Sequence, residues 1–307
     1  MKRVGGTGRR VRDGVLAHSR PLPGAAGLVA GAMMLATAGA ALAADKSSYS
    51  LFNPTPDGQL RDLTTDRPDT TESPFTVDAG HFQVESNLFG YTRSRPAPDG
   101  TVTDSYEIGT TNVRIGVTSN VELNLIWQPY GVVHTHLQPF GSMTQSGIGS
   151  LDVRTKINLW GNDTFEKTGT ALALLPYVSL PTDRHNGISD EHVQGGLIVP
   201  LAIKLSDKLD LGLNGGIAAV RDDGASSYHT EYAATASLAY DWNDKFGTYY
   251  EVAARFHTED PRGDVVMLGT GFLYKLDKNL QLDAGINFGV TPAADRINPF
   301  IGLSRRF

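Results

Sequence analysis

The chain has 307 residues, of which 27 are basic and 33 are acidic, and it contains no cysteine. The missing thiols exclude disulfides, thiolate metal sites, a cysteine nucleophile and a lipid anchor attached to cysteine. Six basic residues and one acidic residue fall within residues 1–43, so the remaining chain has 21 basic against 32 acidic residues and a formal charge of −11. Such an acidic chain argues against nucleic acid as a partner.

Residues 1–43 have the pattern of an export signal. Basic residues precede a run rich in Ala, Gly, Leu and Met that begins near Gly24, and Ala41-Leu42-Ala43 supplies a cleavage box of small residues. The sequence therefore predicts a signal peptide that is cleaved after Ala43. The competing interpretation is a permanent anchor helix, since the run approaches the roughly 20 residues that a spanning helix needs.

Residues 44–79 are predicted to form an irregular arm. Pro54, Pro56, Pro68 and Pro74 interrupt both helix and strand patterns in this segment. We expect the arm to lie in the periplasm or inside the lumen of the domain that follows. Two roles stay open: the arm restricts or gates a passage through that domain, or it is an ordered segment that only helps the first strand to form.

From residue 80 onward, apolar and polar residues alternate with the period of two that is typical of β-strands. The segments 168–180 and 191–205 are weaker, because the first is apolar on both faces and the second contains Pro200, which removes a ladder hydrogen bond. The pattern predicts twelve strands: about 80–92, 104–118, 120–130, 148–160, 168–180, 191–205, 208–221, 227–242, 245–258, 264–276, 279–291 and 296–307.

These strands predict an all-β fold, a transmembrane antiparallel up-and-down β-barrel over residues 80–307. The even number of strands, and the alternation of tight turns with longer loops rich in Gly, Pro, Asp and Ser, are typical of bacterial outer-membrane barrels. Residues 161–167 are an exception, being long for a periplasmic turn. A soluble β-sandwich is the alternative, but its strands usually have only about five or six residues.

The last strand ends on Phe307, an aromatic carboxy-terminus of the kind with which outer-membrane barrels end. We expect Phe307 to be the assembly signal for the barrel assembly machinery. The predicted location is the outer membrane of a Gram-negative bacterium, with its lipids and a small-molecule solute as further partners.

Charged residues on the polar faces of the strands are predicted to line the lumen of the barrel. In one interpretation they form a narrow pore that selects small solutes; in the other they pair across the lumen and plug it, since unpaired buried charges are costly. Twelve strands lie between the eight of a filled barrel and the sixteen of an open porin, so large solutes would need an opening step. The predicted residues are Glu85, Arg114, Glu122, Asp152, Arg154, Lys156, Asp210, Glu231, Glu251, Arg255, Lys275 and Asp283.

Residues 65–85 are the most distinctive string of the chain. They resemble the opening of the family described as "putative MetA-pathway of phenol degradation", which reads roughly D-R-P-x-x-T-x-S-P-x-T-V-x-x-G-x-x-Q-x-E before a barrel. Asp78 and Ala79 depart slightly from the family pattern. The resemblance implies an outer-membrane, transporter-like protein linked to the breakdown of aromatic compounds, and it brings no catalytic residue. It is carried by Asp66, Arg67, Pro68, Ser73, Pro74, Gly80, Gln83 and Glu85.

The sequence thus predicts a channel or transporter for small solutes, with aromatic or hydrophobic molecules as candidates, and it predicts no enzyme, cofactor or metal site. A structural or adhesive barrel is one alternative. Another is a barrel-embedded hydrolase or lipid-modifying enzyme, because His229 and His257 lie toward the outer ends of neighbouring strands, near Ser226, Ser227 and Glu231. No nucleophile motif accompanies these residues.

His134-Thr135-His136 offers two imidazoles on one side of an extended segment. A third ligand at a readable spacing is missing from the sequence around it. We therefore expect a polar loop here and no metal site.

Overall fold

The computed structural model describes residues 45–137, 141–221, 227–258 and 263–307. The predicted signal peptide and residue 44 of the arm lie outside these residues. The described part contains two short helical turns with described bounds, η3 (Asp57–Gln59) and α1 (Phe165–Thr168). No helix in this part of the chain has the length and hydropathy of a membrane-spanning helix.

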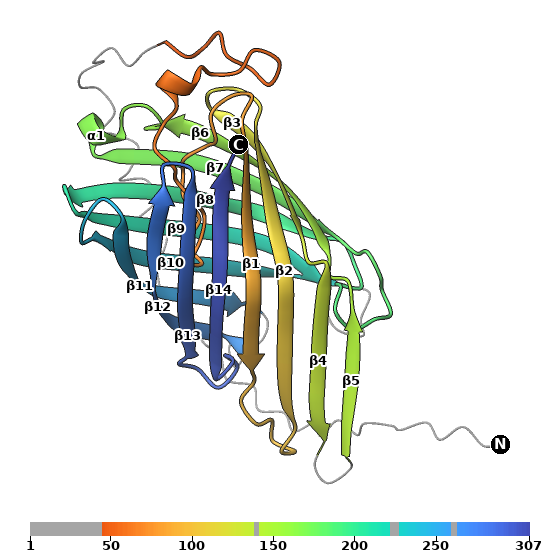
Figure 1. Ribbon diagram of the computed structural model, residues 1–307. Coiled ribbons are helices and arrows are strands. Elements are labelled where there is room, and N and C mark those ends of the chain that lie inside the picture. The colour runs from red at the N-terminus through yellow and green to blue at the C-terminus, as the bar shows by residue number, and fades with distance from the viewer. Residues whose placement is uncertain (1–44, 138–140, 222–226, 259–262) are drawn as a thin grey trace, which may run out of the picture. The chain divides into compact units, whose positions relative to one another are not determined.

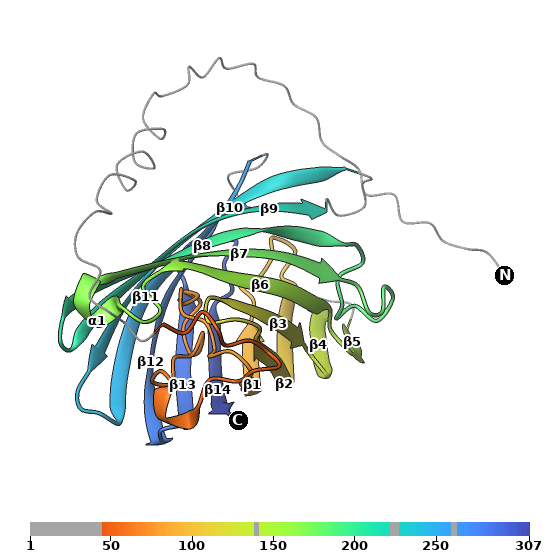
Figure 2. The same cartoon turned by 90° about the horizontal axis from the view of Figure 1, so that it is seen from above.

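Twelve strands form a closed antiparallel ring, so the predicted barrel is confirmed (Figures 1 and 2). The ring closes where β1 pairs with β14, and the backbone N–H and C=O groups of Phe82 and Phe307 exchange two hydrogen bonds at this seam. The strands of the ring are β1 (Phe82–Arg93), β2 (Val102–Gly116), β3 (Val121–Trp127), β6 (Leu151–Trp160), β7 (Thr170–Leu180), β8 (Gln194–Ser206), β9 (Leu209–Arg221), β10 (Tyr228–Asp241), β11 (Phe246–His257), β12 (Val265–Asp277), β13 (Leu280–Gly289) and β14 (Ile297–Arg306).

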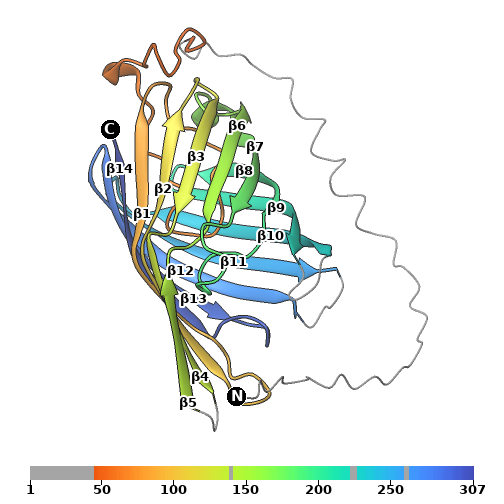
Figure 3. The same cartoon turned by 90° about the vertical axis from the view of Figure 1, so that its right-hand side faces the viewer.

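Two further strands correct the prediction of a loop between residues 131 and 147. β4 (Tyr130–Leu137) and β5 (Gly141–Gly147) form a hairpin. β4 pairs with residues 102–108 of β2, whereas β3 pairs with residues 111–116 of the same strand. The hairpin extends beyond the ring at the end opposite the carboxy-terminus (Figures 1 and 3). Sequence patterning missed these strands because both of their faces carry polar residues, as expected for a part that lies outside the hydrocarbon layer.

The two faces of the ring are adapted to different surroundings. On β11, Tyr250 and Val252 point outward and are 63% and 46% exposed, whereas the side chains of Glu251 and Ala253 between them point inward and are buried. A closed ring pairs its backbone groups within the sheet, as the hydrocarbon layer requires. The apolar outer surface is therefore the lipid-facing surface, and the protein is an outer-membrane β-barrel.

A charge on this outer surface should destabilise the barrel according to its depth. Val252 lies near the middle of β11, and Leu205 lies near the end of β8, with similar exposure. We expect Val252→Arg to lower the free energy of unfolding by about 2–4 kcal/mol and Leu205→Arg by about 0–1 kcal/mol. Urea unfolding in phospholipid vesicles measures both values, and equal costs would contradict the assignment of the lipid-facing surface.

Candidate functional site

The arm enters the barrel and fills part of its lumen. Viewed along the ring, the segment that precedes β1 lies inside the circle of strands (Figure 2). Residues 64–77 contact inward-facing side chains on β1, β2, β3, β6, β10, β11 and β13. The candidate site is therefore built from two parts of the chain, the arm and the inner face of the barrel.

The wall of the barrel replaces water as the hydrogen-bonding partner of the arm backbone. Glu85 accepts from the backbone N–H of Asp66, at 3.0 Å, and Glu251 accepts from those of Thr70 and Thr71, at 3.0 and 2.7 Å. Buried backbone groups need such partners, and an irregular segment has no sheet or helix to supply them. The inward carboxylates thus bind the amide groups of the arm.

Arm carbonyl groups are satisfied in the same way by donors on the wall. The Arg114 guanidinium donates to the carbonyl oxygen of Phe75 at 2.8 Å, and Gln83 donates to that of Thr64 at 2.8 Å. The amide of Asn158 donates to the carbonyl oxygen of Pro74 at 2.9 Å. These contacts hold both sides of the arm loop against the strands.

A buried ion cluster lies at the centre of this interface. Lys156 Nζ is 2.6 Å from the Asp66 carboxylate, and the Arg114 guanidinium is 2.7 Å from Glu85 and 3.0 Å from Glu122. The Arg114, Lys156 and Glu122 side chains have no solvent exposure. Burial opposes ionisation of Asp66, but the positive charges of Arg114 and Lys156 hold the pKa of its carboxyl group well below its usual range.

The tip of the arm forms two more ion pairs with the wall. Arg67 lies 2.7 Å from Asp283, and Glu72 lies 2.7 Å from Arg154, which also pairs with Asp152 at 2.8 Å. Eight of the twelve residues predicted to line the lumen thus belong to the arm interface: Glu85, Arg114, Glu122, Asp152, Arg154, Lys156, Glu251 and Asp283.

The other four predicted lumen residues lie away from the arm interface. Asp210 is opposite Lys204 in the β8–β9 pairing, and Lys275 is opposite Gln281 in the β12–β13 pairing. Glu231 and Arg255 lie nearer the outer end of the lumen, where both line a cavity.

Two glycines on the wall provide the space for the arm. A Cβ atom on Gly116 of β2 would overlap the carbonyl oxygen of Asp78, and one on Gly302 of β14 would overlap the guanidinium of Arg67. Any other residue at Gly116 would displace the arm backbone from the wall, and one at Gly302 would move the Arg67 side chain from its position. These glycines were not identified as site residues from the sequence, because only the path of the arm gives them a role.

The contacts also account for the motif residues of the arm. Ser73 Oγ donates to the Asp66 carboxylate at 2.8 Å, and Pro68 lines a cavity beside Arg67. Gly80 has a φ of +78° where the arm turns into β1, a conformation that favours glycine. The motif is thus a set of residues that dock the arm.

The long connection between β6 and β7 is explained by the base of the arm. Arg61 pairs with Asp163 at 2.8 Å, and the Asn162 amide donates to Thr76 Oγ1 at 2.7 Å. Residues 161–167, which are long for a periplasmic turn, therefore hold the arm where it enters the lumen.

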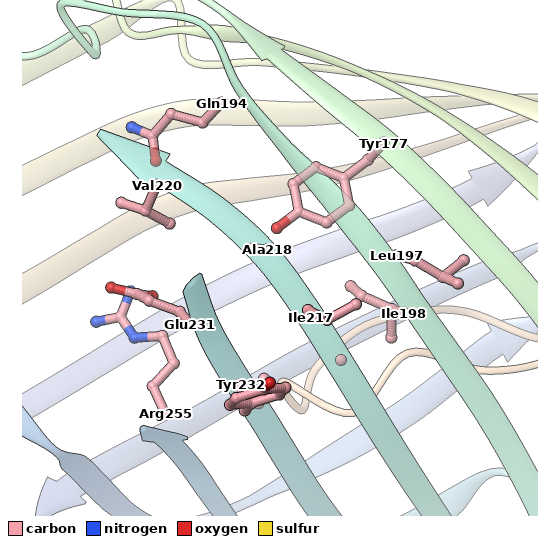
Figure 4. Close-up of a pocket in the computed structure, with 12 residues that line it drawn as sticks. Tyr177, Gln194, Leu197, Ile198, Ile217, Ala218, Val220, Glu231, Tyr232 and Arg255 are labelled. Carbon is pink, nitrogen blue, oxygen red and sulfur yellow. The ribbon is translucent and has the colours of Figure 1, made fainter. Parts of the chain in front are cut away.

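Two cavities lie on the outer side of the arm. One, of about 220 Å³, is bounded by β7 to β11 and combines Tyr177, Gln194, Glu231 and Arg255 with apolar side chains such as Val220 (Figure 4). The other, of about 250 Å³, is lined by residues of β1, β2, β12 and β14, by Asp295 and by the arm residues Arg67 and Pro68. Both offer polar and apolar surface to a small molecule.

The two histidine clusters of the sequence occupy different places. His229 and His257 both direct Nε2 toward Glu231 Oε1, at 3.3 and 2.9 Å. Of the two serines in the hydrolase hypothesis, Ser226 lies outside the described residues, and Ser227 directly precedes β10. His134 and His136 lie on β4 and not in the expected loop, with His136 Nε2 3.0 Å from Asp104.

Sequence reasoning missed several polar residues that hold the arm. Asn158 and Thr235 occupy inward positions of β6 and β10, so the alternation of the strands could have placed them in the lumen. Asn162 and Asp163 lie in a turn and gave no such signal.

Residues 65–307 match the family described as "Putative MetA-pathway of phenol degradation". The chain belongs to this family. The match covers residues 65–79 of the arm together with the barrel, and leaves out the first part of the arm. No curated protein matches the chain.

Solved structures show the same fold. The chain is similar to an outer membrane channel from Pseudomonas putida F1, with 12% identity over 80% of this chain and 100% of that one and a TM-score of 0.59. It is also similar to the transport unit of the autotransporter AIDA-I from Escherichia coli, with 10% identity over 79% of this chain and 92% of that one and a TM-score of 0.51. At this level of identity the likeness concerns the barrel fold.

Removal of the Asp66 carboxylate should release the arm. Lys156 and Arg114 would remain buried with one partner fewer, and breaking a buried ion pair costs about 3–5 kcal/mol. We expect Asp66→Ala to lower the free energy of unfolding by about 3 kcal/mol and to expose the arm to trypsin at Arg61 and Arg67. The control Asp57→Ala, at an exposed arm position, should change stability by less than about 0.5 kcal/mol. An arm that stays protected in Asp66→Ala would contradict this account.

Docking of the arm should depend on pH through Asp69. Burial and the nearby Glu251 carboxylate raise the pKa of Asp69 to about 7. A carboxyl group with a raised pKa binds a proton in the docked state that it lacks in the unfolded state, so stability decreases as the pH rises from about 4 to about 7. We expect Asp69→Asn to remove this part of the pH dependence in urea unfolding, whereas Asp62→Asn, at an exposed position, should leave it unchanged. Parallel pH profiles for wild type and Asp69→Asn would contradict the expectation.

Proposed function

We propose that the protein is an outer-membrane channel for small solutes, with aromatic or hydrophobic molecules as candidates, and that its arm restricts the passage. In this proposal residues 1–43 are a signal peptide, residues 44–79 are the arm, and residues 80–307 are the barrel that spans the membrane. The observation that carries the proposal is the polar, charged lumen whose inner half is filled by a segment held through noncovalent contacts.

The chemistry of the arm interface supports a removable restriction. Most of the contacts described above between arm and wall are hydrogen bonds or ion pairs, and water can replace both when the arm leaves. Arg67 also lies over the ring of Phe300, 5.6 Å from its centroid. The arm contributes Thr70 and Thr71, which hydrogen-bond to the wall, rather than a large apolar surface at its tip. Displacement of the arm would join the two outer cavities to the periplasmic side along the predicted lumen residues.

The nature of the solute is proposed from the cavities and from the relatives. The cavity at β7 to β11 places Tyr177, Glu231 and Arg255 beside apolar side chains, which suits a small molecule with one polar group and one hydrocarbon part. The related structure from Pseudomonas putida F1 is described as an outer membrane channel, and the family description refers to phenol degradation. We propose a channel rather than an enzyme, and a role that needs no cofactor.

A reversible disulfide between the arm and the barrel wall tests the proposal. Thr71 Oγ1 and Thr235 Oγ1 are 2.8 Å apart, one on the arm and one on β10, and the chain has no other cysteine to interfere. We expect the pair Thr71→Cys and Thr235→Cys, when oxidised, to give little current in a planar lipid bilayer. Reduction should restore the wild-type current, and deletion of residues 45–76 should increase the current at least severalfold.

The single variant Thr235→Cys is the matched control, because it changes the wall without tethering the arm. Its current should not respond to oxidant or reductant. A barrel that carries no current even without the arm would refute the channel and favour the structural or adhesive alternative. Equal currents in the oxidised and reduced forms of the double-cysteine variant would refute the proposal that the arm restricts the passage. Addition of small aromatic solutes to the conducting form then tests the proposed solute class through block of the current.

A further inference from the structure

A cluster of two histidines and one glutamate lies at the outer end of the lumen, beyond the arm. His229 and Glu231 are two residues apart on β10 and share its inner face, and His257 lies directly opposite Glu231 in the β10–β11 pairing. The three side chains are partly buried. Glu231 also lines the cavity of Figure 4, so the cluster lies at the edge of a space that a small ligand can enter.

The three potential ligand atoms converge on one point. Both imidazoles direct Nε2 toward the same oxygen, Glu231 Oε1, at 3.3 Å from His229 and 2.9 Å from His257, and all three atoms lie within 4.8 Å of one another. Around a tetrahedral zinc ion with metal–ligand bonds of about 2.0–2.1 Å, ligand atoms are about 3.4 Å apart. Small side-chain rotations are therefore enough to admit an ion between them.

The donor set selects a class of metal. Two neutral imidazoles and one carboxylate carry a single negative charge, which suits a divalent cation. Imidazole nitrogen is favoured by zinc, copper, nickel and cobalt, whereas calcium and magnesium prefer oxygen ligands. With three protein ligands the ion would keep at least one open position, as in zinc sites that bind water or a substrate.

The backbone holds the cluster in place before any ion binds. Glu231 and His257 are a directly opposed pair on adjacent strands, and the two imidazole rings are stacked with centroids 5.7 Å apart. The backbone N–H of His257 donates to Asp264 Oδ1 at 3.0 Å, which ties the end of β11. Arg255 lines the same cavity, and its positive charge should weaken the binding of a cation. We expect a dissociation constant on the order of micromolar.

We propose that His229, Glu231 and His257 form a binding site for a divalent transition-metal cation of the zinc class. Because Glu231 lines the outer cavity, an ion bound to it would lie at the edge of that cavity, where it can hold water or an anionic group of a solute. The site joins β10 to β11 at the outer end of the barrel. It is independent of the proposed channel function, because its test measures the metal itself.

The experiment titrates the full refolded barrel with Co²⁺ and with Zn²⁺. We expect one Co²⁺ per chain, visible absorption bands typical of a tetrahedral or five-coordinate site, and displacement of Co²⁺ by Zn²⁺ at micromolar concentration. Ca²⁺ at a hundredfold excess should displace neither ion. Zn²⁺ should also raise the midpoint of thermal unfolding, since it binds the folded state, in which the three ligands converge, more tightly than the unfolded chain.

Variants then assign the ligands. His229→Gln, Glu231→Gln and His257→Gln should each weaken Zn²⁺ binding by at least tenfold. The matched control is His134→Gln, on β4, whose ring contacts His136 at a centroid distance of 4.5 Å and offers an equally plausible adventitious site. Its affinity for Zn²⁺ should equal that of the wild type.

Three outcomes would overturn the proposal. The first is the absence of a Co²⁺ spectrum in the wild type, which would mean that the cluster is only hydrogen-bonded. The second is loss of Zn²⁺ binding in His134→Gln but not in His257→Gln. The third is displacement of Co²⁺ by Ca²⁺. Because the wild-type spectrum is measured without any substitution, a variant that fails to fold does not prevent the decision.

Discussion

The contact of Asp66 with Lys156 and Arg114 is the interaction on which the organisation of the lumen depends. Both cations lie on the barrel wall without solvent exposure, and the carboxylates of Glu85 and Glu122 lie beside them. A buried charge is tolerated only where geometry and hydrogen bonds compensate its lost hydration. The arm supplies part of that compensation, so wall and arm are each incomplete without the other.

The wall of the barrel complements the backbone of the arm as well as its charges. An arm interrupted by prolines cannot satisfy its own amide and carbonyl groups, and a barrel interior has no strand edge to offer. Inward side chains such as Glu251 and Asn158 supply the hydrogen-bonding partners of the arm backbone. Gly116 and Gly302 leave the space in which the arm lies. The inner part of the polar lumen is therefore a binding surface for the protein's own chain, and in the proposed channel it would face a solute only after the arm leaves.

The outer part of the lumen is organised differently. The cavities there lie beyond the arm and combine charged and apolar side chains, and the imidazoles of His229 and His257 meet the Glu231 carboxylate at their edge. The inner half of the lumen is thus occupied by a segment of the chain, while the outer half has room for a small ligand. In the proposed channel, this division would separate the restriction of passage by the arm from the recognition of the solute in the outer cavities.

The amino-acid sequence by itself determined the twelve-stranded ring, because lipid on one side and a polar lumen on the other impose a period of two that no soluble arrangement needs over such long strands. It also marked Asp66 and Arg67 as distinctive residues of the arm. It could not reveal the β4–β5 hairpin, whose faces both meet water, nor the partners of the lumenal charges. Only the tertiary structure brought His257 opposite Glu231 and Asp66 against Lys156, because strand register and the path of an irregular arm depend on contacts between residues far apart in the chain.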